Sequence, residues 1–293
     1  MNSTVDAHHH LWDLELTPQP WIEGDLAPIN RNFHIDDYID AAGDHVGRSV
    51  VVQTVADPGE TPLLLSIAER TELIGGVVGW VDLTADGVED RIGELLSSSG
   101  AEWLVGIRHL VQDEPDPRWL CRPDVRRGLD ALGRAGLPYD LLTLPNQLEA
   151  AIETVSALPA VSFVVDHLSK PSIADGTLEP WATDLARLGR FPNVTCKLSG
   201  MITEADWSTW TVDDLRRYAD IALDVFGADR MMFGSDWPVC LLAGSYDRVV
   251  ETAHELTAGL DTAERDAVFG RTATRVYGLD RRGPGNDRSP ATT

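Results

Sequence analysis

The chain of 293 residues is predicted to fold as a single (β/α)₈ barrel, an α/β fold built on a parallel sheet. Three observations predict it. Eight short apolar runs recur along the sequence, helix-like stretches lie between most of them, and ionisable residues follow nearly every run. Alternating strands and helices favour parallel pairing, because parallel neighbours need a long crossover connection. The expected catalytic domain covers residues 1–279.

The eight apolar runs are expected to be strands because they are short and rich in β-branched residues. Runs such as Val50-Val51-Val52 are apolar at consecutive positions, which is typical of strands buried on both faces. A doubly wound open sheet is the rival architecture, but no glycine-rich phosphate loop follows the first run. The expected strands cover residues 4–7, 49–55, 74–81, 103–108, 138–142, 161–165, 194–198 and 231–233.

Amphipathic stretches between the strands are expected to be helices. The first connection, from Leu11 to about Asp44, is long and contains several prolines, and we expect it to form a loop over the mouth of the barrel. Residues 280–293 are polar and rich in glycine and proline, which predicts a disordered tail. The expected helices include residues 62–70, 88–97, 125–135, 147–158, 181–188 and 213–226.

The composition excludes several classes of partner. Acidic residues outnumber basic ones by 47 to 24, and a formal net charge of -23 repels nucleic acid and anionic lipid. No apolar run approaches the ~18 residues needed to cross a bilayer, and no secretory leader is evident. The three cysteines form no CxxC pair, which disfavours a disulfide framework or structural zinc site. We expect a cytoplasmic protein; the sequence does not specify its oligomeric state.

Candidate catalytic residues come from the ends of the strands, where the active sites of such barrels lie. His8 and His10 are spaced i, i+2 and therefore face the same side of the first strand. Asp236 follows the last strand, so closure of the barrel is expected to bring its carboxylate beside these imidazoles. His167 follows the sixth strand. Each assignment has a structural alternative. The run that holds His8 and His10 could be an exposed loop, Asp236 could cap a turn, and His167 could be a hydrogen-bonded histidine of the core.

A second group of polar and aromatic residues lies in or after the strands and is expected to bind substrate. Arg108 and Lys170 follow apolar strands and would contact substrate oxygen atoms, while Trp80 would form a wall of the pocket. The predicted substrate-binding residues are Arg108, Lys170, Gln53, His109, Ser199 and Trp80.

Five ordered motifs, from about Thr4 to Tyr277, resemble those of the amidohydrolase-related lactonases, particularly the L-fuconolactonase and L-rhamnonolactonase branch. The resemblance implies a (β/α)₈ barrel that opens sugar lactones with water. It assigns Asp236 the transfer of the proton and identifies His8, His10 and His167 as the family histidines. The motifs are Asp6-Ala7-His8-His9-His10-Leu11-Trp12-Asp13, Gly106-Ile107-Arg108-His109, Asp166-His167-Leu168-Ser169-Lys170-Pro171, Lys197-Leu198-Ser199-Gly200 and Phe233-Gly234-Ser235-Asp236-Trp237-Pro238.

The resemblance leaves the metal requirement open. Many metal-dependent amidohydrolases carry a histidine or a carboxylated lysine on the fifth strand, but this strand reads Leu137-Pro138-Tyr139-Asp140-Leu141-Leu142. A two-metal site is therefore not expected. The two alternatives are metal-independent activity and one divalent ion, such as Zn²⁺, held by His8, His10, His167 and Asp236.

The function expected from these observations is hydrolysis of a sugar-acid lactone, an aldonolactone, with Asp236 acting first as general base and then as general acid. Sugar-acid lactones are favoured over dicarboxylate lactones, because few cationic side chains occur at the strand ends and a dianionic substrate would call for several arginines. The alternatives are a metal-dependent decarboxylase, a dicarboxylate-lactone hydrolase and a non-catalytic barrel that binds carbohydrate.

Overall fold

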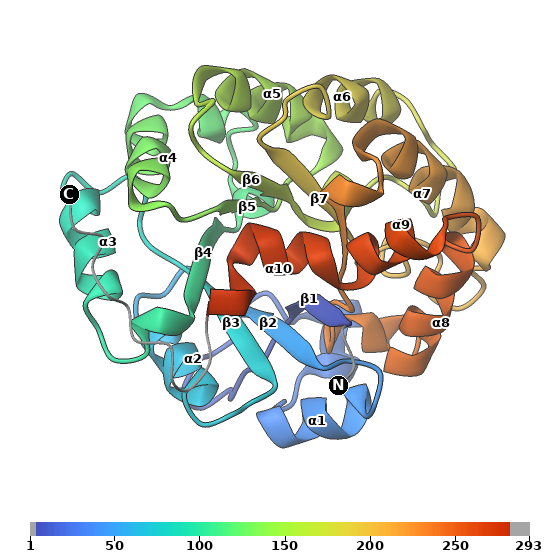
Figure 1. Cartoon of the computed structure of the whole chain (residues 1–293), viewed down its shortest axis with the longest axis horizontal. Helices are drawn as coiled ribbons and strands as arrows, with labels where there is room; N and C mark the ends of the chain where they lie inside the picture. The colour runs from blue at the N-terminus through green and yellow to red at the C-terminus, as the bar shows by residue number, and fades with distance from the viewer. Residues whose placement is uncertain (1–3, 282–293) are drawn as a thin grey trace.

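The computed structural model describes residues 4–281 and confirms the predicted (β/α)₈ barrel (Figure 1). Eight parallel strands form one sheet in which each strand pairs with the next along the chain. The strands are β1 (Val5–His9), β2 (Arg48–Val52), β3 (Ile74–Gly79), β4 (Leu104–His109), β5 (Tyr139–Leu141), β6 (Phe163–Val165), β7 (Val194–Leu198) and β8 (Met231–Phe233).

Helices surround the strands in chain order (Figure 1). Helix α1 (Ile35–Ala42) lies in the first connection, which was expected to be a loop; the Asp37 carboxylate accepts a hydrogen bond from the His34 backbone N–H and caps the helix start. No helix within residues 4–281 is long and apolar enough to cross a membrane. The other helices are α2 (Glu60–Ala68), α3 (Val88–Leu96), α4 (Pro123–Ala135), α5 (Leu148–Ala157), α6 (Trp181–Leu188), α7 (Val212–Phe226), α8 (Tyr246–Leu256), α9 (Thr262–Asp266) and α10 (Thr272–Tyr277).

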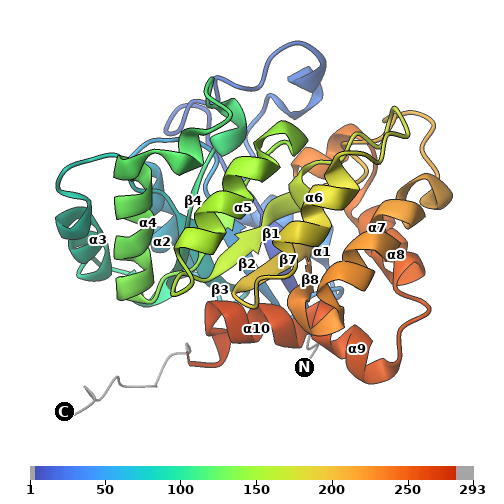
Figure 2. The ribbon, with the colours of Figure 1, turned by 90° about the horizontal axis from the view of Figure 1, so that it is seen from above.

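Alternate strand residues pack into two separate cores. Val51 packs in the layer under the helices, whereas its neighbours Val50 and Val52 pack inside the barrel against Tyr277 and Leu279 from the end of the chain. Helix α10 therefore covers one end of the barrel, opposite the segment that follows β1, as Figure 2 shows. Residues 279–281 form a 3-10 turn, and residues 282–293 of the predicted tail lie outside the described residues.

A bulge in β1 sets the direction of its histidines. Asp6 pairs with Ser49 and His9 with Val51, so β1 uses one more residue than β2 over this interval. The imidazole of His9 consequently stacks on Tyr38 of α1, with ring centroids 3.8 Å apart. His8 contacts side chains from the opposite side of the barrel instead. The strand also extends to His9, two residues beyond the expected end.

Asp6 closes the barrel between β1 and β8. One oxygen of its fully buried carboxylate accepts the backbone N–H groups of Ser235, at 2.8 Å, and His8, at 3.1 Å. The other accepts the hydroxyl groups of Tyr38, at 2.9 Å, and Tyr246, at 3.0 Å. The Asp236 N–H also donates to the His8 carbonyl at 2.8 Å. The first strand is thus bonded to the segment that follows the last.

Replacing Asp6 by alanine is expected to lower the free energy of unfolding by about 3–5 kcal/mol, because two backbone N–H groups and two tyrosine hydroxyls lose their acceptor. Urea denaturation of D6A beside D220A, which alters an exposed aspartate of α7, measures the effect. Equal stability of the two variants would contradict the importance of this carboxylate.

Candidate active site

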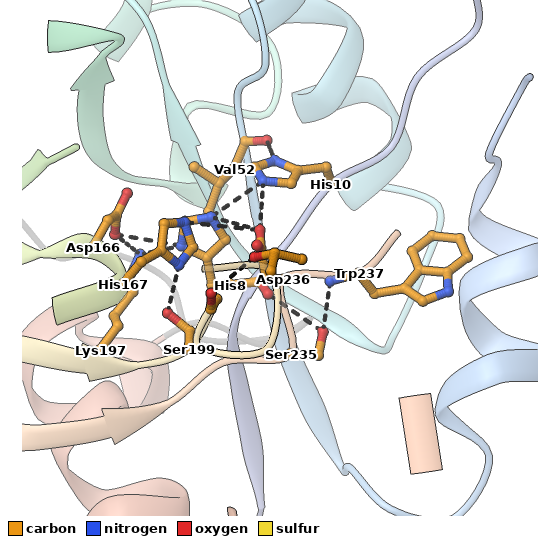
Figure 3. A network of polar contacts seen from close by, with 12 residues as sticks. His8, His10, Val52, Asp166, His167, Lys197, Ser199, Ser235, Asp236 and Trp237 are labelled. Atoms are coloured by element: carbon orange, nitrogen blue, oxygen red, sulfur yellow. Dashed lines mark hydrogen bonds and ion pairs between the residues drawn. The ribbon is translucent and has the colours of Figure 1, made fainter. Parts of the chain in front are cut away.

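Three imidazoles gather around the Asp236 carboxylate at the carboxyl ends of the strands (Figure 3). Asp236 Oδ1 lies 3.4 Å from Nε2 of His10 and 3.8 Å from Nε2 of both His8 and His167. All four residues are buried. The structure therefore brings together the four residues proposed from the sequence as catalytic, although β1 and β8 stand at opposite ends of the chain.

Two glycines allow this close packing. A Cβ atom on Gly234 would lie 2.7 Å from Cβ of His8, and one on Gly200, which has φ +62°, would lie 2.5 Å from Nδ1 of His167. Both distances are too short for a side chain, so each glycine is required where the backbone approaches an imidazole. Asp236 itself has a φ of 57°, a turn that leaves its carboxylate facing the histidines.

A left-handed turn follows β6 and carries two of the predicted site residues. His167, Leu168, Ser169 and Lys170 all have φ between 51° and 57°, although L-residues seldom adopt this conformation in succession. Tertiary bonds hold it: Trp181 donates its indole N–H to the Leu168 carbonyl at 2.6 Å, and the Ser169 hydroxyl bonds that of Thr143 at 2.9 Å. His167 and Lys170 consequently both face the same cavity.

Hydrogen bonds constrain the protons of the first two histidines. Nδ1 of His10 lies 2.7 Å from the Val52 carbonyl, which can only accept, so Nδ1 carries a proton and Nε2 is left to contact Asp236 and His8. The Nε2 atoms of His8 and His10 lie 3.2 Å apart. Nδ1 of His8 can accept from the Lys197 ammonium at 3.1 Å, whereas the Arg108 guanidinium, also a donor, lies 3.3 Å from Nε2 of His8. The contacts of His8 therefore do not select one tautomer.

A buried charge network lies beneath the histidines. The Lys197 ammonium contacts Asp140 at 2.6 Å and Asp166 at 2.9 Å in addition to His8, so its three N–H donors have three acceptors. Arg108 donates to the other Asp166 oxygen at 3.0 Å. Tyr277 of α10 donates its hydroxyl to Asp140, 2.8 Å from the nearer oxygen. Two cations balance two carboxylates inside the barrel.

This environment sets the charge of each group at neutral pH. Burial lowers the pKa of His167 to about 4, and burial together with Lys197 holds the pKa of His8 well below its ordinary value. Burial alone would raise the pKa of Asp236, but His167, His10 and Lys170 outweigh it and keep that pKa below the usual range. The site therefore presents an ionised carboxylate beside neutral His8 and His167 imidazoles.

A cavity of about 240 Å³ opens above these groups. His8 is completely buried and lies below it, whereas the other three central residues reach its surface. Trp21 from the first connection and Trp207 from the segment after β7 contribute aromatic walls, so the first connection does reach the mouth of the barrel as expected. The ionisable groups lining the cavity include His10, Arg108, His167, Lys170, Glu204 and Asp236.

The remaining predicted substrate-binding residues contact other side chains rather than lining this cavity. Gln53 accepts a hydrogen bond from Nε of Arg108 at 3.1 Å, and the Ser199 hydroxyl bonds Nδ1 of His167 at 2.8 Å. Trp80 donates to Nδ1 of His109 at 3.0 Å, and Nε2 of His109 lies 2.7 Å from Glu114. Both nitrogens of His109 are therefore already engaged.

Sequence reasoning did not select several residues that shape the site. Asp140 and Lys197 occur in the quoted strand motifs but were given no role; each stands between two apolar strand residues that face the helices, so its side chain must point inward. That alternation is a usable signal. Glu204 and Trp207 lie in the connection between β7 and α7, where no periodic pattern marks them, so only the structure reveals their position.

Two sets of described residues could hold a metal ion: His8 with His10 and Asp236, or His8 with Asp166 and His167. Nε2 of the neutral His10 ring, with Asp236 Oδ1 at 3.4 Å, presents the nitrogen and oxygen ligands that zinc accepts. His8 could join them in the tautomer that directs Nδ1–H toward Asp166, at 3.4 Å. The donor set fits a single divalent ion.

Comparisons with known proteins agree with this geometry. The amidohydrolase family model matches residues 5–279. L-fucono-1,5-lactonases of Burkholderia multivorans and Burkholderia ambifaria are 38% and 35% identical to the chain, covering 94% and 96% of it and 96% and 97% of their own lengths. A solved amidohydrolase structure from B. multivorans with bound zinc has a TM-score of 0.88 at 36% identity, covering 94% of this chain and 99% of that one. The chain belongs to the amidohydrolase family, which confirms the resemblance seen in its motifs.

Replacing Lys197 by methionine is expected to lower the free energy of unfolding by about 3–5 kcal/mol at pH 8, because Asp140 and Asp166 lose their shared cation. Burial already raises the pKa of Asp140 to about 6, and loss of the ammonium raises it further. An acid with a raised pKa in the folded state stabilises the fold when protonated, so the deficit should shrink at pH 5.

The measurement is urea denaturation of wild type, K197M and R91M at both pH values; Arg91 is an exposed cation on α3. A deficit for K197M that stays the same at pH 5 and pH 8 would show that the two carboxylates do not depend on this ammonium.

Proposed function

We propose that this protein hydrolyses the ring ester of a sugar-acid lactone, with L-fucono-1,5-lactone as the first candidate substrate. The observation that carries the proposal is the ionised Asp236 carboxylate, which lies within 3.8 Å of three imidazoles at the edge of a small cavity. The names of the two Burkholderia relatives support the same reaction class. The free thiols of its three cysteines are in keeping with the expected cytoplasmic location.

In this mechanism Asp236 moves the proton. A water molecule beside the carboxylate loses a proton to it and attacks the lactone carbonyl carbon. The ring C–O bond then breaks, and Asp236 returns the proton to the departing alkoxide, which leaves a hydroxy acid. The lowered pKa of Asp236 keeps it ionised, and therefore able to act as a base, throughout the neutral range.

The surrounding side chains stabilise charge and orient the reactants. Arg108 lines the cavity, and the hydrogen bonds that its guanidinium donates to Gln53 and Asp166 fix its position, so it can donate to the developing oxyanion without reorganising. His167 is oriented by Ser199 and, being neutral, can bond the attacking water. Lys197 acts through its neighbours: it contacts the ring of His8 and the Asp166 carboxylate that holds Arg108.

A divalent ion held by His8, His10 and Asp236 would polarise the carbonyl and lower the pKa of a bound water. The roles given to Arg108, His167 and Asp236 do not depend on that ion. A metal-dependent decarboxylase remains an alternative function, which carbon dioxide release without lactone opening would indicate. A non-catalytic carbohydrate-binding barrel would bind lactone without forming acid.

Replacing Asp236 by asparagine is expected to reduce kcat/KM about 10²- to 10⁴-fold, because the base and the returning acid are lost while the shape is kept. Acid release from L-fucono-1,5-lactone, followed with a pH indicator, measures the loss. D224N, at an exposed aspartate of α7, is the matched control. If D236N kept half of the wild-type kcat/KM, another group would have to be the base.

Zinc is expected to raise the Tm of chelator-treated protein but not that of H10Q, which lacks the imidazole nitrogen that faces Asp236. Differential scanning calorimetry with Zn²⁺ and with Mg²⁺ as a control measures the shift. An equal rise for both proteins would place zinc elsewhere. Turnover of the same chelated sample tells whether the ion is needed for hydrolysis.

A further inference from the structure

A second charged pair, Glu204 with Lys170, lines the cavity beside the four central residues. Glu204 Oε1 lies 3.4 Å from the Lys170 ammonium, and their side chains are 23% and 24% exposed. Lys170 ends the left-handed turn after β6, and Glu204 comes from the segment between β7 and α7. Both border the cavity that Asp236 and His167 also line.

The segment that carries Glu204 is held in place by its own hydrogen bonds. The Glu204 N–H donates to the Met201 carbonyl at 3.2 Å, and its carbonyl accepts from Ala174 at 3.0 Å. The indole of Trp207 donates to the Thr203 carbonyl at 2.8 Å. The Glu204 carboxylate and the Trp207 indole therefore line the cavity from a segment whose backbone is held by hydrogen bonds. Such a segment loses little conformational entropy when a ligand binds.

The Glu204 carboxylate has acceptor capacity that its contacts in the protein do not use. A carboxylate can accept about four hydrogen bonds. Within residues 4–281, Lys170 is the cation at ion-pair distance from Glu204. Burial raises the pKa of Glu204, and Lys170 only partly opposes this effect. A partly buried carboxylate has lost some of the water that would bond it, and a ligand in the cavity could supply hydrogen-bond donors in its place.

The walls of the cavity suit the rest of a sugar ring. Trp21 and Trp207 offer aromatic surface, and Leu110 and Leu142 offer aliphatic surface for C–H groups. The volume of about 240 Å³ is below the ~300–1,000 Å³ of sites for drug-sized ligands, which suits one small ring. Donors on such a ring are hydroxyl groups.

The charges in the cavity disfavour a substrate with a second carboxylate. Asp236 and Glu204 are both acidic. Of the two cations, Arg108 is bonded to Asp166 and Gln53, and Lys170 is paired with Glu204. A carboxylate on the substrate would have to compete with an acidic side chain for either cation, whereas a hydroxyl can donate to Glu204 and accept from Lys170 at once.

We propose that Glu204, together with Lys170, binds hydroxyl groups of the substrate and so selects neutral polyhydroxylated lactones over lactones that carry a free carboxylate in addition to the ring ester. This inference rests on the proposed lactone hydrolysis and names a specificity-determining residue for it. Glu204 contacts the substrate away from the bond that breaks, so its loss weakens binding of hydroxylated rings and leaves the chemical step largely unchanged.

The test compares two lactones with the same ring size, L-fucono-1,5-lactone, which carries hydroxyl groups, and δ-valerolactone, which has none. In E204Q the ratio of their kcat/KM values is expected to fall about 10- to 100-fold, mainly through a higher KM for the fuconolactone. D-glucaro-1,4-lactone bears a carboxylate. In E204Q its kcat/KM should rise at least several-fold relative to that of fuconolactone, because the negative charge of Glu204, which repels the carboxylate, is removed.

Controls separate this role from a structural one. E72Q, at an exposed glutamate, should leave all ratios unchanged. E204D keeps the charge but shortens the side chain by one methylene group, so it should also lower this ratio. It serves as the test variant if E204Q folds poorly. A parallel loss on all three lactones, or an unchanged ratio, overturns the role of Glu204. Failure of the wild type to open any lactone overturns the proposed function instead.

Discussion

The hydrogen bonds that Asp6 accepts between the first and last strands are the constraint on which the rest of the site depends. One carboxylate oxygen holds the backbone of His8 and of Ser235, and the second holds tyrosines from α1 and α8. Asp236 directly follows Ser235. The same backbone groups therefore close the barrel and place the Asp236 carboxylate against the imidazoles.

The interior of the barrel adds a second constraint, because it holds charges that cannot reach water. Lys197, Arg108, Asp140 and Asp166 are all buried and form a neutral set. Such groups are costly to bury unless every donor is matched, and here the ammonium finds three acceptors. The chain has 22 arginines and only two lysines. A compact ammonium can bond acceptors in three directions, whereas the planar fork of arginine cannot.

Much of the fold follows from local patterns in the sequence. The alternation of apolar runs and amphipathic stretches was enough to predict eight strands, and the spacing of His8 and His10 was enough to place them together. Helix α1 was missed because the prolines and the polar first turn of this connection resemble a loop. Its start depends on a cap between Asp37 and the His34 backbone.

Other features depend on contacts between residues far apart in the chain. The bulge in β1 arises from its register with β2, and the left-handed turn at His167 needs bonds from Thr143 and Trp181. Local preference alone would disfavour that turn at four non-glycine residues. The inward direction of Lys197 could have been predicted from its apolar neighbours, but the acceptors that surround it come from three different strands or strand ends.

The scarcity of lysine has a practical consequence for anyone who handles this protein. Lys197 is sealed within the barrel, so Lys170, which lines the cavity and is partly exposed, is the one lysine that a side-chain amine reagent can reach. Dyes, cross-linkers and resins that couple through lysine would attach inside the cavity that Asp236 lines and obstruct it. Immobilisation through one of the many exposed carboxylates outside the cavity would leave it open.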